Sequence, residues 1–182
     1  IEMPQTAIFK AFDFTASADF ENVLTKRSKR HFKNDILPYI DTYEIKIQEQ
    51  LSDSELQKAY ELFLNVKENN LAINNFTYAF GLFEAMNKNN NWSFLLALDP
   101  LNHEMVGVVF CYKNGTNNSF NPILIGMSDS DQHRLILYRQ LLFQTILYAK
   151  KENFNKIYFG VSAIFEKRKL GAKVYDKEAY VQ

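Results

Sequence analysis

The spacing of apolar and polar residues predicts a strand, a long helix and a second strand in the last third of the chain. A short apolar run, Ile123 to Ile125, is typical of a strand that is covered on both faces. Ser and Asp residues at 128–131 then offer N-caps for a helix whose apolar positions recur from Leu135 to Ala149. A second apolar run, Ile157 to Val161, predicts the next strand. Because this order is so compact, we expect parallel strands joined by a right-handed crossover.

Ligands of open sheets with such crossovers bind beyond the carboxyl ends of the strands. In this chain those ends lie near Gly126 to Asp129 and near Val161 to Lys167. The pattern therefore predicts a crevice between the two strand ends and places a candidate ligand site in it.

The remaining apolar patterns predict an antiparallel sheet ahead of this unit. Trp92 to Leu98 and Met105 to Tyr112 are apolar runs joined by a turn-rich segment, which indicates a hairpin. Alternation over Tyr43 to Ile47 predicts a half-buried strand, and the Ser52-Xaa-Xaa-Glu55 capping box predicts the start of a helix. Further predicted elements are a short edge strand, or alternatively a hydrophobic staple for the next helix, at 7–14, a helix from 17 or 19 to 35, a helix beginning at 74 or 75, and a last strand at 179–182.

The overall composition indicates one cytoplasmic domain, 1–182, without a strong overall electrostatic field. The 21 basic residues balance 21 acidic ones, so the net charge recruits neither nucleic acid nor a membrane, and no membrane partner is expected. No signal peptide and no apolar run long enough to cross a membrane is present in the sequence. The one cysteine, Cys111, lies in an apolar run and fits a core residue better than a nucleophile. Since the chain begins at Ile1 rather than Met, other domains of a longer polypeptide are candidate partners.

One strong basic cluster occurs in the first fifth of the chain. Its members all fall on the predicted helix that ends at Asp35: Lys26, Arg27, Lys29, Arg30, His31 and Lys33. Short basic runs are common, so a solvated helix face is favoured over an anion or phosphate site.

A series of short motifs runs from about Trp92 to Ala172. The residues that form them are Gly126, Met127, Tyr138, Arg139, Leu141, Leu142, Ile146, Ala149, Ile157, Phe159, Gly160, Lys167, Leu170 and Gly171. The order of these motifs resembles that of the GNAT acyltransferases, and their residues are similar to those of the FemAB-like and BioF2-like acetyltransferase domains. The resemblance implies an α/β (α+β) fold with a mixed, mostly antiparallel twisted sheet flanked by helices. It also implies an N-acyltransferase that moves an acyl group from acyl-CoA, such as acetyl-CoA, to a small-molecule or other amine.

The sequence departs from that family at one important loop. Most GNAT enzymes hold the coenzyme A pyrophosphate on a glycine-rich turn before a helix, where free N–H groups and the helix dipole favour anions. The corresponding turn here, Met127 to Gln132, has no glycine and contains Asp129 and Asp131. Two alternatives to a coenzyme A enzyme therefore stay open. One is a non-catalytic ligand-binding or docking module on the same fold, and the other is a FemAB-like transferase that uses aminoacyl-tRNA.

Acyl transfer requires groups that stabilise an oxyanion and move protons. Backbone N–H groups near Ile125, Gly126 and Met127 are candidates for the oxyanion. Candidate general acids are Tyr158 and Tyr175, and candidate bases or amine anchors are Glu104 and Asp129; each of them also fits an ordinary core or surface residue.

Three further residues are candidates for binding the donor. Lys167 could meet a phosphate or the oxyanion after a strand end, or it could belong to a solvated turn. Tyr138 and Arg139 begin the long helix on the crevice side, although Tyr138 also fits the apolar stripe of that helix. The three histidines show no spacing typical of metal ligands, so no metal is expected.

Overall fold

A single mixed sheet organises the chain in the computed structural model, which describes residues 2–68, 77–129 and 133–178. Its strand order is β2-β3-β4-β5-β6-β1-β7. The strands are β1 (Glu2–Phe9), β2 (Glu44–Gln48), β3 (Trp92–Leu98), β4 (Met105–Asn114), β5 (Ser119–Met127), β6 (Lys156–Gly160) and β7 (Lys173–Glu178). Within this sheet β5 and β6 run parallel and the other neighbours are antiparallel, which confirms the predicted fold class.

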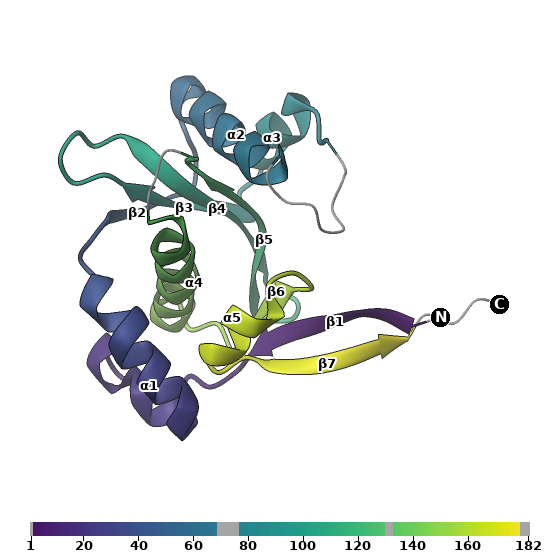
Figure 1. Ribbon diagram of the computed structural model, residues 1–182. Coiled ribbons are helices and arrows are strands. Elements are labelled where there is room, and N and C mark those ends of the chain that lie inside the picture. The colour runs from purple at the N-terminus through teal and green to yellow at the C-terminus, as the bar shows by residue number, and fades with distance from the viewer. Residues whose placement is uncertain (1, 69–76, 130–132, 179–182) are drawn as a thin grey trace.

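Helices cover both faces of the sheet (Figure 1). The α-helices are α1 (Lys26–Asp35), α2 (Asp53–Glu68), α3 (Phe80–Asn87), α4 (Arg134–Lys151) and α5 (Ile164–Lys169), with 3₁₀ turns η1 (Ser17–Val23) and η2 (Leu37–Tyr39). α2 and α3 pack on one face of β3, β4 and β5, and α4 packs on the other face with α1 beside it. The helix α4 connects β5 to β6, so the predicted parallel crossover is confirmed.

Two helix starts show how local chemistry sets the element boundaries. The predicted capping box is confirmed, because the Ser52 amide donates to Glu55 Oε2 at 2.8 Å and the Glu55 amide donates to Ser52 Oγ at 3.3 Å. The single helix predicted from 17 or 19 to 35 is wrong. Leu24 and Thr25 are extended, and the Thr25 hydroxyl caps a new helix by accepting from the Ser28 amide at 3.3 Å.

The N-terminal strand lies inside the sheet rather than at its edge. β1 pairs with β6 through Ala7–Phe9 and with β7 over a longer stretch, so the prediction of a short edge strand at 7–14 is wrong. β1 and β7 continue beyond β6 as a two-stranded ribbon that projects from the body (Figure 1). The strand predicted at 179–182 and the helix start predicted at 74 or 75 lie outside the described residues.

Candidate active site: the cleft between β5 and β6

The two parallel strands separate soon after they begin. Their pairing consists of Ser119 with Lys156 and Phe120 with Ile157, after which β5 continues to Met127 without β6 beside it. A register shift against β4 falls at Ile123, which is 52% exposed. The prediction that this strand is covered on both faces is therefore wrong at Ile123. At this position β6 no longer lies beside β5, and the separation of the two strands opens a cleft.

The part of β5 that borders the cleft directs backbone groups into it. Hydrogen-bonded and non-hydrogen-bonded positions alternate along an antiparallel pair. Because the Ser128 amide donates to the Val106 carbonyl at 2.8 Å, the N–H groups of Met127 and Ile125 point away from β4. Among the described residues no strand pairs with β5 on that side beyond Phe120. These two N–H groups are therefore available to a ligand in the cleft.

Gly126, which lies between Ile125 and Met127, allows α2 to pack closely on β5. A Cβ atom at this position would lie 2.7 Å from the Phe63 backbone nitrogen and 2.8 Å from the Leu62 carbonyl carbon. The backbone of α2 thus packs directly on β5 there, and only glycine allows this approach. Gly126 holds α2 against the strand, while its neighbours in sequence face the cleft.

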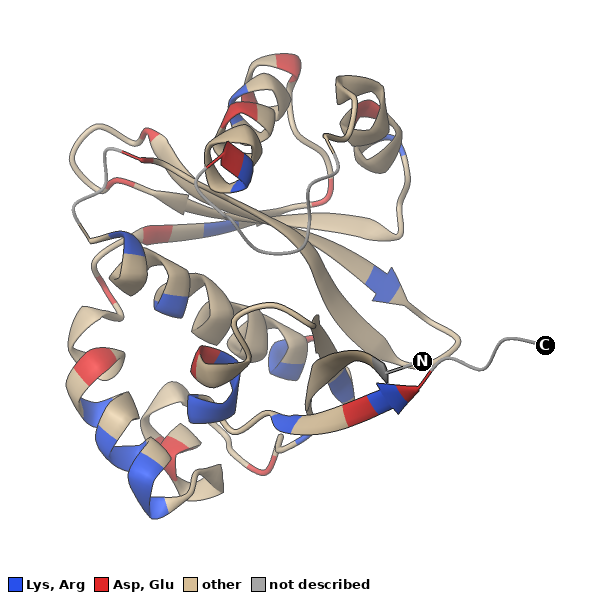
Figure 2. Ribbon diagram, turned by 45° about the vertical axis from the view of Figure 1, so that its right-hand side comes forward, with Lys and Arg blue, Asp and Glu red and all other residues tan. Residues whose placement is uncertain are grey.

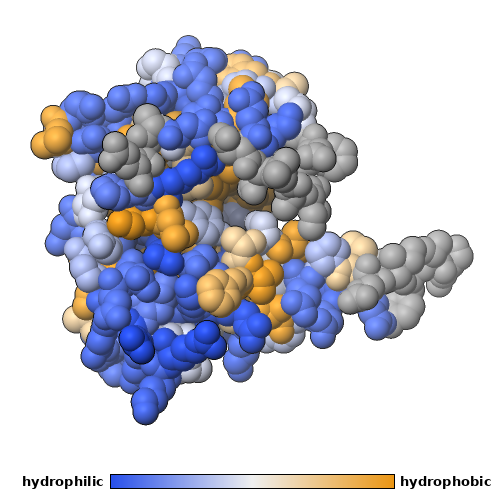
Figure 3. Space-filling model, viewed as in Figure 1, coloured by the Kyte–Doolittle hydropathy of each residue, from blue (hydrophilic) through white to orange (hydrophobic). Residues whose placement is uncertain are grey.

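Large apolar side chains are exposed on β5 and on the helices α4 and α5 that precede and follow β6. Ile123 on β5 and Leu135 on α4 are each 52% exposed, and Phe165 on α5 is 61% exposed. Figure 3 shows a hollow on this face of the molecule, bordered by hydrophobic surface. Exposed apolar groups beside a concave surface are typical of a ligand site.

Lys167 lies inside the protein at the carboxyl end of β6. Its side chain is 4% exposed, and its ammonium donates to the carbonyl oxygens of Phe159 at 2.5 Å and Ser162 at 2.6 Å. Burial lowers the pKa of Lys167 to about 8. The alternative of a solvated turn is wrong for this residue, which belongs to α5. Lys167 holds the connection from β6 to α5, in which Gly160 and Ala163 take positive φ values of 75° and 47°.

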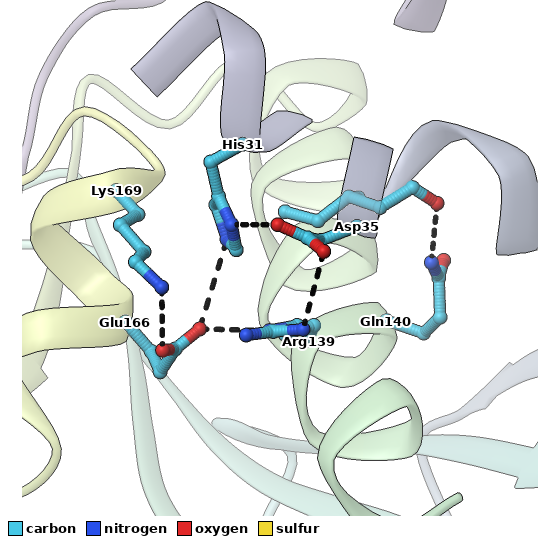
Figure 4. Close-up of polar contacts among 7 residues, drawn as sticks. His31, Asp35, Arg139, Gln140, Glu166 and Lys169 are labelled. Carbon is cyan, nitrogen blue, oxygen red and sulfur yellow. Dashed lines mark hydrogen bonds and ion pairs between the residues drawn. The ribbon is translucent and has the colours of Figure 1, made fainter. Parts of the chain in front are cut away.

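A polar cluster joins α1, α4 and α5 beside the cleft (Figure 4). Arg139 Nε donates to Glu166 Oε2 at 2.8 Å, and Lys169 Nζ lies 3.1 Å from Glu166 Oε1. Burial alone raises the pKa of Glu166, but the hydrogen bonds and charges of Arg139 and Lys169 outweigh it, so the net pKa lies below its usual range. Arg139 is therefore committed to an ion pair that fixes α5 against α4.

His31 lies between two carboxylates of this cluster. Its Nδ1 is 2.6 Å from Asp35 Oδ2, and its Nε2 is 3.7 Å from Glu166 Oε2 without a hydrogen-bond partner in the structure. Burial lowers the pKa of His31 below its usual value, against the opposing effect of the hydrogen bond to Asp35. The residue pattern does not predict this cluster, although His31 and Asp35 stand four residues apart on one helix.

Tyr138 belongs to the packed side of α4. Its ring packs against the core on the α4 side of the sheet, and burial together with the nearby charge of Glu166 strongly raises the pKa of its phenol. This position supports the apolar-stripe interpretation of Tyr138. Its hydroxyl is therefore held in the protonated form across the physiological pH range.

The candidate acids and bases are only partly brought together. Tyr158 on β6 pairs with Ile8, and Tyr175 on β7 pairs with Thr6, so both tyrosines lie on one face of the sheet. Tyr175 is 41% exposed. Glu104 lies instead in the β3–β4 turn, where its carboxylate is 2.6 Å from Lys58 Nζ on α2.

Asp129 follows the carboxyl end of β5. Its carboxylate is 2.7 Å from Arg134 Nη1 in the first turn of α4. A carboxylate therefore stands next to the start of the crossover helix, where the glycine-rich turn of a GNAT enzyme would place free N–H groups. Asp131 lies outside the described residues.

Other hollows on the described surface lie away from this cleft. One, of about 420 Å³, is open between β2 and α4 and is lined by Ile45, Ile47, Leu147 and Tyr148 among others. Another, of about 300 Å³, lies between β2, α2 and the β3–β4 hairpin. Residues 2–68, 77–129 and 133–178 contain no group of three His, Cys, Asp or Glu side chains that could hold a metal ion.

Comparison with known proteins supports the fold. No protein-family model matches the sequence, and no curated protein matches it. Among solved structures, FemX is similar with a TM-score of 0.68 and 9% identity, covering 96% of this chain and 60% of FemX. A GCN5-related N-acetyltransferase from Sphaerobacter thermophilus is similar with a TM-score of 0.55 and 13% identity, covering 96% of this chain and 50% of that one.

A third similar structure is L-PGS from Bacillus licheniformis, with a TM-score of 0.57, 13% identity, and coverage of 88% of this chain and 45% of that one. The chain thus spans about half the length of these proteins. It has a GNAT-like fold of the kind found in FemX, as the sequence motifs predict.

Proposed function

We propose that this chain is an N-acyltransferase domain whose reaction takes place in the cleft between β5 and β6. The observation that supports the proposal is the pair of N–H groups of Ile125 and Met127, which point into the cleft without a strand partner among the described residues. Two such donors can stabilise the oxyanion that forms when an amine attacks an acyl carbonyl. Acyl-CoA is the donor that we propose, and a small-molecule amine is the acceptor.

The reaction balances with groups that border the cleft. The amine nitrogen forms a C–N bond to the thioester carbon while the carbonyl oxygen gains charge, and the C–S bond then breaks. The amine gives one proton to the carboxylate that anchors it, and the leaving thiolate takes one up from the general acid. In this proposal Asp129 anchors the amine in preference to Glu104, because Asp129 follows the carboxyl end of β5 whereas Glu104 lies in the β3–β4 turn beside Lys58 of α2. Tyr158 is the proposed acid, with Tyr175 as the alternative on the same face.

The proposed roles of the remaining residues are positional. Lys167 shapes the end of β6, and Arg139 fixes α5, so both would hold the cleft walls for the donor rather than react with it. Tyr138 would support the same wall through its packing on α4. Gly126 would keep β5 close to α2, so that Ile125 and Met127 present their N–H groups.

A second candidate donor is an aminoacyl ester carried by tRNA. Asp129, paired with Arg134 at the start of α4, favours it because a carboxylate there opposes the binding of a pyrophosphate. The similarity of the fold to FemX is compatible with either donor.

The proposal is tested by donor binding followed by product analysis. We expect acetyl-CoA or a longer acyl-CoA at 100 times its dissociation constant to stabilise the fold by about 2.7 kcal/mol in thermal unfolding. Ile123→Arg should abolish the effect by filling the cleft, whereas Leu101→Arg, at a position that is 91% exposed in the β3–β4 turn, should not. Mass spectrometry of an amine library then detects transfer. Binding without transfer to any amine supports the non-catalytic module, and stabilisation by aminoacyl-tRNA alone supports the second donor.

A further inference from the structure

Cations without acidic partners gather at one corner of the fold. α1 carries five Lys or Arg residues and one carboxylate, and α5 carries three Lys or Arg residues and one carboxylate. Both carboxylates are occupied, Asp35 by His31 and Glu166 by Arg139 and Lys169. The cationic corner, as we define it, consists of exposed residues of α1, α5 and the start of β7 for which the described part of the structure contains no ion pair: Lys26, Arg27, Arg30, Arg168 and Lys173.

The members of this corner come from neighbouring elements. Arg27 stands one turn before His31, which faces Glu166 of α5. Leu24, just before α1, lies 3.0 Å from the position of a Cβ at Gly171, just after α5. The first half of α1 therefore lies beside the end of α5 and the start of β7, and Figure 2 shows their Lys and Arg segments in the lower part of the molecule, with Asp and Glu segments among them.

Exposed apolar side chains adjoin the cationic corner. Phe165 is 61% exposed and stands three residues before Arg168 on α5, and Lys169 Nζ lies 4.2 Å from the centre of its ring. Ile123 on β5 and Leu135 on α4 are two further exposed apolar residues. Figure 3 shows hydrophobic surface around the hollow and hydrophilic surface over α1 on the same face.

We propose that this face binds the surface of an anionic lipid bilayer. The cationic corner would lie against phospholipid phosphates, and Phe165 would enter the boundary between headgroups and acyl chains. Cations flanking exposed apolar side chains are the combination that peripheral membrane binding uses. None of the described helices is long and apolar enough to cross a membrane.

A nucleic acid fits the surface less well. Proteins that bind single-stranded RNA stack bases on aromatic side chains, and Phe165 is the one aromatic residue among the three exposed apolar residues at the cleft. The aliphatic side chains of Ile123 and Leu135 offer no ring on which a base can stack. The boundary between lipid headgroups and acyl chains can bury both aliphatic and aromatic side chains. The sequence predicts no membrane partner because its total charge is balanced. The total charge does not describe how charges are distributed over the folded surface, where the cations of the cationic corner lie close together.

This inference goes beyond the proposed function and does not depend on it. If the face binds a bilayer, the mouth of the cleft opens at the lipid surface, and an amphiphilic donor or acceptor can enter without crossing water. Membrane binding and acyl transfer are measured separately, so either can fail alone.

Sedimentation with lipid vesicles tests the proposal. We expect the protein to bind vesicles that contain phosphatidylglycerol and not vesicles of phosphatidylcholine alone, with binding that weakens as salt rises. Arg27→Glu with Arg30→Glu should weaken the binding at least about tenfold, and Phe165→Ser about tenfold. Lys88→Glu and Leu82→Ser, exposed positions at α3, are matched controls and should change nothing.

Several outcomes would overturn the proposal. It fails if the wild-type protein ignores anionic vesicles, or if the α3 controls weaken binding as much as the α1 and α5 variants do. It also fails if a single-stranded RNA binds through Arg27 and Arg30 while vesicles do not bind. Should the charge-reversed variant not fold, Lys26→Gln with Lys173→Gln must still weaken vesicle binding.

Discussion

The buried ammonium of Lys167 donates a 2.5 Å hydrogen bond to the carbonyl oxygen of Phe159 on β6. A second bond, to Ser162, lies just beyond the strand, so one side chain holds the whole connection from β6 to α5. That connection forms one wall of the cleft. The shape of the candidate site therefore depends on a charged group that does not itself lie open to solvent.

Replacing Lys167 by Met should destabilise the fold. The methionine fills similar space but leaves two carbonyl groups without a donor, at a cost of about 1–3 kcal/mol in the free energy of unfolding. Arg168→Met, one position away and exposed, is the control and should change stability by less than about 0.5 kcal/mol. Urea unfolding of the two variants gives the comparison, and equal stabilities would contradict the structural role of Lys167.

The same lysine should make stability depend on pH. Its pKa in the folded protein is about 8, below the ordinary value of 10.5, so the unfolded chain binds more protons between these two pH values. Stability contributed by this group therefore increases as pH rises from about 8 toward 10.5. The measurement is the difference in unfolding free energy between the wild type and Lys167→Met across this range. A difference that stays flat or decreases with pH would refute the shift.

Gly126 should not tolerate a methyl group. Gly126→Ala places a Cβ 2.7 Å from the Phe63 backbone nitrogen, and we expect a loss of about 1–3 kcal/mol as α2 is pushed away from β5. Gly115→Ala is the matched control, because nothing lies within 4 Å of the added Cβ there. Thermal unfolding should separate the two variants clearly. Similar melting temperatures would show that α2 does not pack directly on the strand.

Arg139 and Glu166 should behave as an energetically coupled pair. Their side chains are 13% and 14% exposed, so removal of either partner leaves a poorly solvated charge, and Arg139→Met should cost about 1–3 kcal/mol. The double variant Arg139→Met with Glu166→Gln should cost less than the sum of the single changes. An additive result in a double-mutant cycle would mean that the ion pair does not stabilise the contact between α4 and α5.

Local sequence patterns were sufficient for the elements whose chemistry is local. The crossover unit and the Ser52 to Glu55 capping box were both predictable, because periodicity and capping depend on residues a few positions apart. The break at Thr25 was missed, since a run of residues that suit a helix does not reveal that one threonine caps a new start.

Long-range relationships were beyond the reach of these patterns. The pairing of Ala7 with Val174 places β1 inside the sheet, and no periodicity connects residues so far apart in the chain. The burial of Lys167 and the contact between His31 and Glu166 have the same origin, because they arise only when α5 packs against β6 and α1. The sequence pattern indicates Lys167 as a candidate site residue. Only the fold shows that its buried side chain holds the connection from β6 to α5, which borders the cleft.

Occupation of the cleft by an acyl donor is measured most directly by protection of a thiol placed at its mouth. The native Cys111 is fully buried, and burial raises the pKa of its thiol, so it should not react with an alkylating reagent in the folded protein. Ile123→Cys supplies a reactive thiol on β5, and Leu101→Cys supplies a control in the β3–β4 turn. A thioether analogue of acyl-CoA, which cannot transfer its acyl group, should slow alkylation at position 123 at least about tenfold when the site is more than about 90% occupied, and leave position 101 unchanged. Equal alkylation rates at position 123 with and without the analogue, and with aminoacyl-tRNA in its place, would contradict the assignment of this cleft as an acyl-transfer site.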